Sequence, residues 1–356
     1  MTTIPASARR VGERSGPGIV RPTAGRPVYI GGLDRSGKTT MAAFLTSHPN
    51  IAIPDVGSNM WTYFFGRFGD LAMPENLDRC LRAMLRYSHV RFLDPDPDRI
   101  RREFSEGLPT YARLFSLFLI HYAEARGKSR WGAQTGLIER YADQVFRAEP
   151  EARVIQMVRD PRDRYEASLA LWPDGKGRAG AAAARWRYSI QLGEQNLRAY
   201  PGRYMLVRYE DLVVRTEGTL RRVCAFLGEA FVPAMLEMPG ATERRQRMMA
   251  RAGLGTEGPL LSPGFIGRFR GRVPPRELVF LQLHLGRLMR THNYHPERLD
   301  LSPGEWTRFA LIDWPGHAAR MLAWRVVETL QQRFPRWLGR QPDTRTPEEP
   351  RTGASR

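Results

Sequence analysis

Lysine is scarce in this chain of 356 residues. Only Lys38, Lys128 and Lys176 occur among its 55 basic side chains, so arginine supplies nearly all of the positive charge. This skew is typical of a GC-rich bacterial genome, which weakens the usual link between a net charge of +18 and nucleic acid. The arginines are scattered and form no nucleic-acid motif. The charge therefore favours an anionic small ligand or an anionic surface, and we expect no nucleic-acid partner.

Cysteine and long hydrophobic runs are also in short supply. Two cysteines, Cys80 and Cys224, lie far apart in helix-like segments, and this spacing favours buried apolar thiols over a disulfide or a metal pair. No apolar run approaches the roughly 20 residues of a membrane-spanning helix. No signal-peptide core follows Met1, so we expect a cytoplasmic protein.

Short, continuous apolar runs are present at 28–31, 152–158 and 204–207. Runs of this kind are typical of buried parallel strands. Segments with helical periodicity follow or separate them, at 38–47, 75–88, 97–106, 110–126, 137–148, 163–171, 180–200 and 216–227. The alternation predicts an α/β fold, with three α/β/α layers around a central parallel sheet.

Composition divides the chain into four parts. Residues 1–26 and 341–356 are predicted to be disordered tails, and 27–300 one main domain in which 56–130 forms a helical insertion. Residues 301–340 form a helical extension rich in Trp and Arg, with a basic amphipathic stretch at 316–334. Such a helix packs on its own domain, on a second subunit of a homodimer, or on an anionic membrane. In the last case the membrane would be the inner membrane of a bacterium.

The most informative motif follows the first apolar run. Residues 32–39 fit G-x-x-x-x-G-K-[ST], a glycine-rich turn that opens a helix. Such a turn directs backbone N–H groups and the positive end of a helix dipole at one point, where a phosphate binds. The candidate ligands are Arg35, Ser36, Gly37, Lys38, Thr39 and Thr40.

Three later segments belong with this loop. They read R-V-I-Q-M-V-R-D-P-R-D at 153–163, R-Y-E-D-L at 208–212 with F-L-G at 226–228, and G-R-F-R at 267–270. Together with R-S-G-K-T-T at 35–40, this ordered set resembles the sulfotransferases that use 3′-phosphoadenylyl sulfate (PAPS). The resemblance implies a fold like that of P-loop NTPases.

The resemblance also implies a reaction and its residues. A sulfuryl group would pass from PAPS to a hydroxyl or amine of a carbohydrate, lipid or small metabolite, without a metal. Lys38 and Arg35 would neutralise the leaving 5′-phosphate. Arg159 and Ser168 would bind the 3′-phosphate, and Arg268 would assist in donor binding. The 56–130 helices would wall the acceptor pocket.

The chain departs from the family pattern at several positions. Lys38 stands where the family has Thr, Gln134 where it has Lys, and Ser168 lies nine rather than eight residues after Arg159. Either the turn holds one extra residue or another donor serves the 3′-phosphate. Asp55 is the nearest carboxylate for a general base, although it also suits a loop or helix-capping role.

Two alternatives use the same residues. The loop is also similar to that of Mg²⁺-dependent nucleotide kinases, and Asp163-Arg164-Tyr165 with Ser168 matches their D-R-Y-x-x-S. Phosphoryl transfer requires a carboxylate for Mg²⁺ at a strand end, where this chain has Arg159. The second alternative is a non-catalytic protein that binds a nucleotide or an anionic surface.

Overall fold

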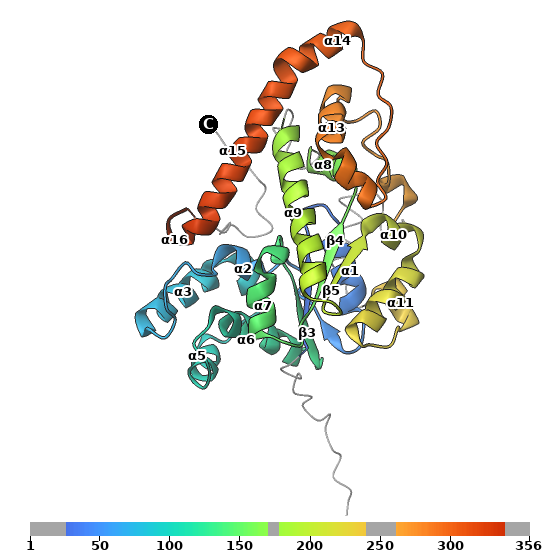
Figure 1. Cartoon of the computed structure of the whole chain (residues 1–356). Helices are drawn as coiled ribbons and strands as arrows, with labels where there is room; N and C mark the ends of the chain where they lie inside the picture. Colours follow the sequence, from blue (N-terminus) through green and yellow to red (C-terminus); the bar gives the residue numbers. More distant parts are fainter. Residues whose placement is uncertain (1–25, 170–177, 240–260, 339–356) are drawn as a thin grey trace, which may run out of the picture.

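The computed structural model describes residues 26–169, 178–239 and 261–338. Its centre is one five-stranded sheet in the order β2-β3-β1-β4-β5, in which every neighbouring pair is parallel (Figure 1). The strands are β1 (Val28–Gly31), β2 (Ile51–Ala52), β3 (Arg130–Gln134), β4 (Arg153–Val158) and β5 (Tyr204–Arg208). Because β1 lies between β3 and β4, the segment that follows it emerges at the middle of the sheet.

Helices cover both faces of this sheet and confirm the predicted three-layer α/β fold. Before β4 they are α1 (Lys38–Thr46), α2 (Met60–Tyr63), α3 (Pro74–Arg86), α4 (Ser88–Arg91), α5 (Pro97–Ser105), α6 (Tyr111–Glu124), η1 (Ile138–Tyr141) and α7 (Ala142–Ala148). After β4 come α8 (Pro161–Leu169), α9 (Ala179–Ala199), α10 (Tyr209–Val214), α11 (Thr216–Leu227), η3 (Pro233–Glu237), η5 (Pro263–Phe265) and α13 (Pro275–Thr291).

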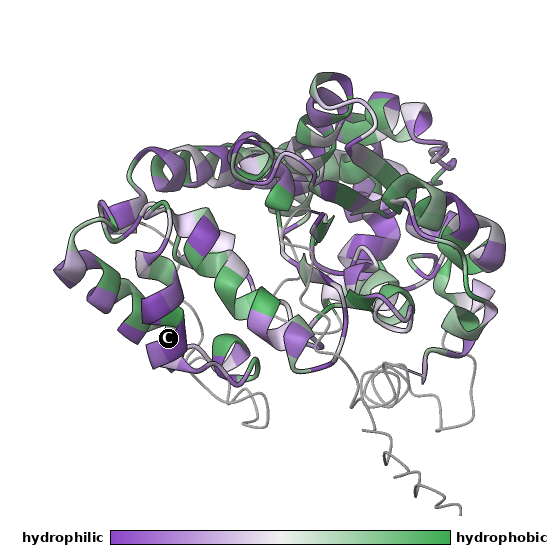
Figure 2. Cartoon of the chain, turned by 90° about the horizontal axis from the view of Figure 1, so that it is seen from below, coloured by the Kyte–Doolittle hydropathy of each residue, from purple (hydrophilic) through white to green (hydrophobic). Residues whose placement is uncertain are grey.

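The apolar core lies in three clusters around the sheet. One joins β1 and β3 to the helices between residues 60 and 124, and another joins β1 and β4 to α1 and α11. The third packs α9 against α13. Figure 2 shows the strands in the hydrophobic colour and helices that carry both colours, as expected for helices with one buried face. Cys80 and Cys224 are free and buried, which confirms their predicted apolar role.

The predicted runs correspond to β1, β4 and β5, but two strands were not foreseen. Arg130–Gln134 is fully buried between β1 and β2, although its sequence R-W-G-A-Q carries no aliphatic run. Gly132 explains its fit, because a Cβ there would lie 2.7 Å from the Val28 carbonyl of β1. The strand is therefore set by close packing rather than by β propensity.

Four helical elements follow at the C-terminus, and the longest of them, α15 (Trp314–Arg333), runs along α9 (Figure 1). They are α14 (Pro303–Arg308), a π-helical turn η6 (Phe309–Asp313), α15 itself and α16 (Pro335–Leu338). A Cβ at Gly180 of α9 would lie 1.8 Å from the His317 carbonyl, so the two helices are in backbone contact. Glu328 of α15 also forms an ion pair with Arg140.

Within the described ranges, none of these helices is long and apolar enough to cross a bilayer. The extension at 301–340 is helical as far as residue 338 and packs on its own domain through one face. Almost all of the two predicted tails lies outside the described residues, and the division of the chain into domains stays a prediction.

Candidate functional site: a phosphate loop beside an arginine cluster

The loop after β1 has the geometry of an anion cradle. Gly32 and Gly37 adopt φ values of +107° and +96°, in the left-handed region that side chains disfavour. Gly37 caps α1 without a side-chain hydrogen bond, which leaves the first N–H groups of that helix directed away from the helix body. The predicted loop from Arg35 to Thr40 is therefore built to receive an anion.

A buried carboxylate supports the loop from below. Glu139 is 1% exposed, and its Oε2 accepts the Gly32 N–H at 3.1 Å. The Ser189 hydroxyl of α9 donates to the other carboxylate oxygen. Burial raises the pKa of Glu139, although these hydrogen bonds and the Lys38 charge oppose the shift. Glu139 was not singled out from the sequence, because nothing in its segment marks it as more than a helix residue.

Lys38 and Ser36 turn inward toward the loop itself. The Lys38 ammonium donates to the Gly32 and Leu33 carbonyls at 2.8 and 2.7 Å and lies 3.9 Å from Asp34. The Ser36 hydroxyl also donates to Leu33, at 2.7 Å. The Lys38 ammonium thus donates its hydrogen bonds to the loop carbonyls, and its role at the 5′-phosphate stays a prediction.

Arg159, at the end of β4, joins the loop to a distant segment. Its guanidinium donates to the Arg35 carbonyl at 3.2 Å and to the Phe265 carbonyl at 2.9 Å, and it stacks 4.5 Å from the Tyr209 ring centroid. Gly37 packs against the same tyrosine, since a Cβ there would lie 2.5 Å from Cδ2 of Tyr209. Sequence positions 35, 159, 209 and 265 thus meet at one place.

The segment that carries Arg268 is anchored to the start of α8. The Asp163 carboxylate accepts the N–H groups of Gly267 and Phe269 at 2.7 and 3.1 Å. Arg268 stacks over Phe265, whose carbonyl Arg159 contacts, and approaches Glu166 at 3.8 Å. The structure therefore brings Arg268 to the Arg159 side of the loop, and its part in donor binding stays a prediction.

Arg164 of α8 is a second buried arginine near Arg159. Arg164 is 3% exposed, and its Nε has no hydrogen-bond partner within the described part of the chain. Burial, together with the charges of Arg185 and Arg159, lowers its pKa to about 9, although Asp34 opposes the shift. Arg185 of α9 forms an ion pair with Asp34 at 3.1 Å. Two arginines, Arg164 and Arg185, thus gather with Lys38 around the Asp34 carboxylate.

Ser168 lies on α8, one turn beyond Arg164. Its hydroxyl donates to the Arg164 carbonyl at 2.9 Å, a bond within the helix. The proton that was predicted to reach a 3′-phosphate is therefore used by the backbone in this structure. The binding role of Ser168 stays a prediction.

On the other side of the loop, Asp55, Gln134 and Thr39 come together. The Gln134 side chain, 4% exposed at the end of β3, donates to the Asp55 carbonyl at 3.4 Å and accepts the Thr39 hydroxyl at 3.3 Å. Asp55 follows β2 and is half-buried. The carboxylate proposed as the base thus belongs to the strand-end edge of the sheet that also carries the phosphate loop.

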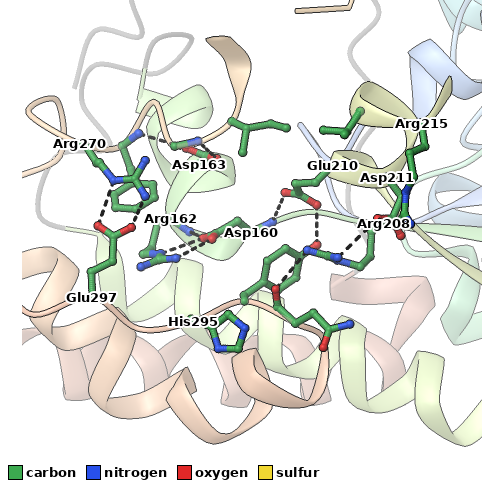
Figure 3. Close-up of a pocket in the computed structure, with 16 residues that line it drawn as sticks. Asp160, Arg162, Asp163, Arg208, Glu210, Asp211, Arg215, Arg270, His295 and Glu297 are labelled. Atoms are coloured by element: carbon green, nitrogen blue, oxygen red, sulfur yellow. Dashed lines mark hydrogen bonds and ion pairs between the residues drawn. The ribbon is translucent and has the colours of Figure 1, made fainter. Parts of the chain in front are cut away.

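On the side away from the phosphate loop, the turn after β4 is held by an ion pair and by hydrogen bonds (Figure 3). Both Asp160 oxygens accept from Arg162, at 3.0 and 2.7 Å, and Glu210 accepts the Asp160 N–H at 2.9 Å and the Tyr294 hydroxyl at 2.8 Å. These residues line a cavity of about 440 Å³ that neither the phosphate loop nor Arg159 lines. We therefore treat Glu210 and Asp160 as supports of the turn.

Comparisons with known proteins agree with this geometry. Residues 27–233, more than half of the chain, match the model of the sulfotransferase family. No curated protein sequence matches the chain. The sulfotransferase domain of the olefin synthase from Synechococcus PCC 7002 is similar in structure, with a TM-score of 0.50 and 20% identity over 82% of this chain and 100% of that one.

Two further solved structures are similar to this chain at lower TM-scores. The sulfotransferase domain from the curacin biosynthetic pathway has a TM-score of 0.48 and 16% identity over 76% of this chain and 98% of that one. A sulfotransferase from Alicyclobacillus acidocaldarius has a TM-score of 0.39 and 17% identity over 81% and 99%. The structural likeness bears on the fold alone, whereas the family model also covers the phosphate loop, Arg159 and the Tyr209 segment, and the chain therefore belongs to the sulfotransferase family.

Proposed function

We propose that the chain transfers the sulfuryl group of PAPS to a hydroxyl or amine of a carbohydrate, lipid or small metabolite. The observation that carries this proposal is the position of Arg159. One guanidinium contacts both the phosphate loop and the segment of Arg268. A nucleotide with a phosphate at each end of its ribose suits a site in which two anion-binding loops share one arginine.

The residues have separate roles in binding the donor. The loop N–H groups from Gly37 to Thr40 receive the 5′-phosphate, with Lys38 and Arg35 as the neutralising cations. Arg159 and Ser168 bind the 3′-phosphate, and Arg268 adds charge at that end. Arg164 lies buried beside Arg159 and raises the positive potential of the whole site.

The transfer forms one bond and breaks another. The acceptor oxygen or nitrogen forms a bond to sulfur while the bond from sulfur to the 5′-phosphate oxygen breaks, and the electron pair stays on the phosphate. The loop amides and Lys38 stabilise that developing charge. The acceptor proton passes to the Asp55 carboxylate as general base. Gln134 fixes the Asp55 backbone and supplies an uncharged hydrogen-bond donor nearby.

The acid beside Arg159 argues against a kinase. A Mg²⁺-dependent phosphoryl transferase needs a free carboxylate facing the loop from the neighbouring strand end. Asp160 is the residue nearest that position, and both of its oxygens are engaged by Arg162 on the far side of the turn (Figure 3). The kinase alternative would require this ion pair to open.

Thermal denaturation with three ligand conditions tests the proposal. At 100 times its Kd, 3′,5′-ADP stabilises a protein by about 2.7 kcal/mol, which raises the Tm of a chain of this size by about 5–10 °C. We expect that shift with 3′,5′-ADP and none with Mg-ATP at the same concentration. A shift with Mg-ATP alone would favour a kinase, and no shift with either would favour a non-catalytic surface binder.

A further inference from the structure

One face of the C-terminal helices is apolar and exposed. Helix α15 packs on α9 through His317 and Trp324, and its Glu328 pairs with Arg140 of η1. Its other side bears Leu322, Val326 and Leu330, which are spaced four residues apart and therefore form one stripe. We call the exposed apolar residues of this region the outer face; they are Leu311, Ile312, Trp314, Leu322, Val326, Val327, Leu330, Phe334 and Trp337, each at least 40% exposed.

The size of this face sets it apart from ordinary surface residues. Single exposed apolar side chains are common and need no partner, whereas a continuous apolar patch marks an interaction site. The nine residues of the outer face are distributed from η6 to α16, and Trp337 at the end is 88% exposed. One apolar side of helix α15 therefore packs on the protein, and a second apolar side faces outward, where another apolar layer can contact it.

The exposed charged side chains of α15 and α16 are of one sign. Arg320, Arg325, Arg333 and Arg336 are exposed over residues 314–338. The single carboxylate of that stretch is Glu328, which is buried and paired with Arg140. The surface around the outer face is therefore cationic, on a chain with a net charge of +18.

This charge pattern identifies the occupant. A second copy docked on the outer face would place these arginines against identical arginines, with no exposed acidic residue from 314–338 to pair with them. A bilayer surface with anionic lipids offers both an apolar layer and negative headgroups. We infer that the outer face binds peripherally to an anionic membrane, with α15 lying in the plane of the interface.

Flotation of the full-length chain with vesicles tests this inference. We expect binding to phosphatidylcholine vesicles that contain phosphatidylglycerol, and weak binding without it. Burying one leucine or valine is worth about one order of magnitude in partitioning. The triple variant Leu322→Ser, Val326→Ser, Leu330→Ser should therefore lose about 10³-fold in binding to the anionic vesicles. Arg325→Gln should lose about fivefold.

A matched variant controls for the general loss of exposed apolar side chains. Leu108, Val214 and Leu283 are exposed apolar residues at other places, and their triple change to Ser should leave vesicle binding unchanged. Equal loss in both triple variants, or no binding by the wild-type chain, would overturn the inference. Concentration-dependent dimers that the α15 triple variant abolishes, without vesicle binding, would assign the face to a second copy instead. None of these results depends on whether the chain binds PAPS.

Discussion

Replacing Arg164 by Met distinguishes a role in donor binding from a structural role, because the two roles predict opposite changes in thermal stability and in donor affinity. Arg164 is 3% exposed, and burial lowers the pKa of its guanidinium to about 9, so the fold disfavours the charged form. Met keeps much of the apolar stem and removes the buried cation. Replacing a poorly paired buried charge by a hydrophobic residue is often neutral or stabilising by about 1–4 kcal/mol. We expect the Tm of the ligand-free variant to stay level or to rise.

Donor binding should change in the opposite direction. Two unit charges about 8 Å apart interact by about 2 kcal/mol at an effective dielectric constant of about 20. Loss of the Arg164 charge should therefore weaken 3′,5′-ADP binding about 30-fold. Calorimetric titration measures this loss, and a thermal scan of the free protein measures stability. Arg187→Met, on the exposed side of α9, removes a charge without touching the cluster and serves as the control.

Two results would refute this reasoning. If the free variant is less stable and binds 3′,5′-ADP as tightly as the wild-type protein, Arg164 is a structural residue. If Arg187→Met weakens binding as much as Arg164→Met, the effect belongs to net charge rather than to the buried cluster. Failure of the wild-type protein to bind 3′,5′-ADP would instead overturn the proposed donor.

Three further substitutions test other parts of the site. Arg159→Ala should weaken binding of 3′,5′-ADP far more than binding of 5′-AMP, measured by titration with both; equal losses would remove Arg159 from the 3′-phosphate. Asp55→Asn should lower turnover about 10²–10⁴-fold in a sulfuryl-transfer assay while donor affinity is kept, and unchanged turnover would exclude it as the base. Burial raises the pKa of Glu139, so ionising it costs stability as pH rises from the unfolded-state value near 4.5 toward the higher folded-state pKa. Glu139→Gln removes that cost and should therefore gain in Tm relative to the wild-type protein between pH 5 and pH 8; a constant difference would contradict this account.

The candidate site residues that the sequence singled out lie in continuous motifs. The loop from Arg35 to Thr40, Arg159 and Arg268 were identified because fixed spacing and a strand-turn-helix pattern mark them. Glu139 and Arg185 carry no local mark, because their roles depend on Gly32 and Asp34, which are 107 and 151 residues away along the chain. Such partners become visible only when the sheet order is known.

The same limit applies to the fold. The runs that became β1, β4 and β5 are continuous and apolar, so their pattern was sufficient. Strand β3 is stabilised by neighbours on both sides and by Gly132 rather than by its own composition. Helix α13 was not named from the sequence either, although Pro275 at its start and its apolar face are readable signals.

The contact between Gly180 and His317 bears on the modularity of the chain. Helix α9 begins with small residues at 179–184, and α15 covers this stretch at backbone distance. The same α9 provides Arg185 and Ser189 to the phosphate loop and its supporting carboxylate. The C-terminal helices therefore cannot be exchanged or removed as an independent cassette. Additional residues could extend the C-terminal helices outward. Any bulkier residue at position 180 would displace α15 from α9, the helix that supports the donor site.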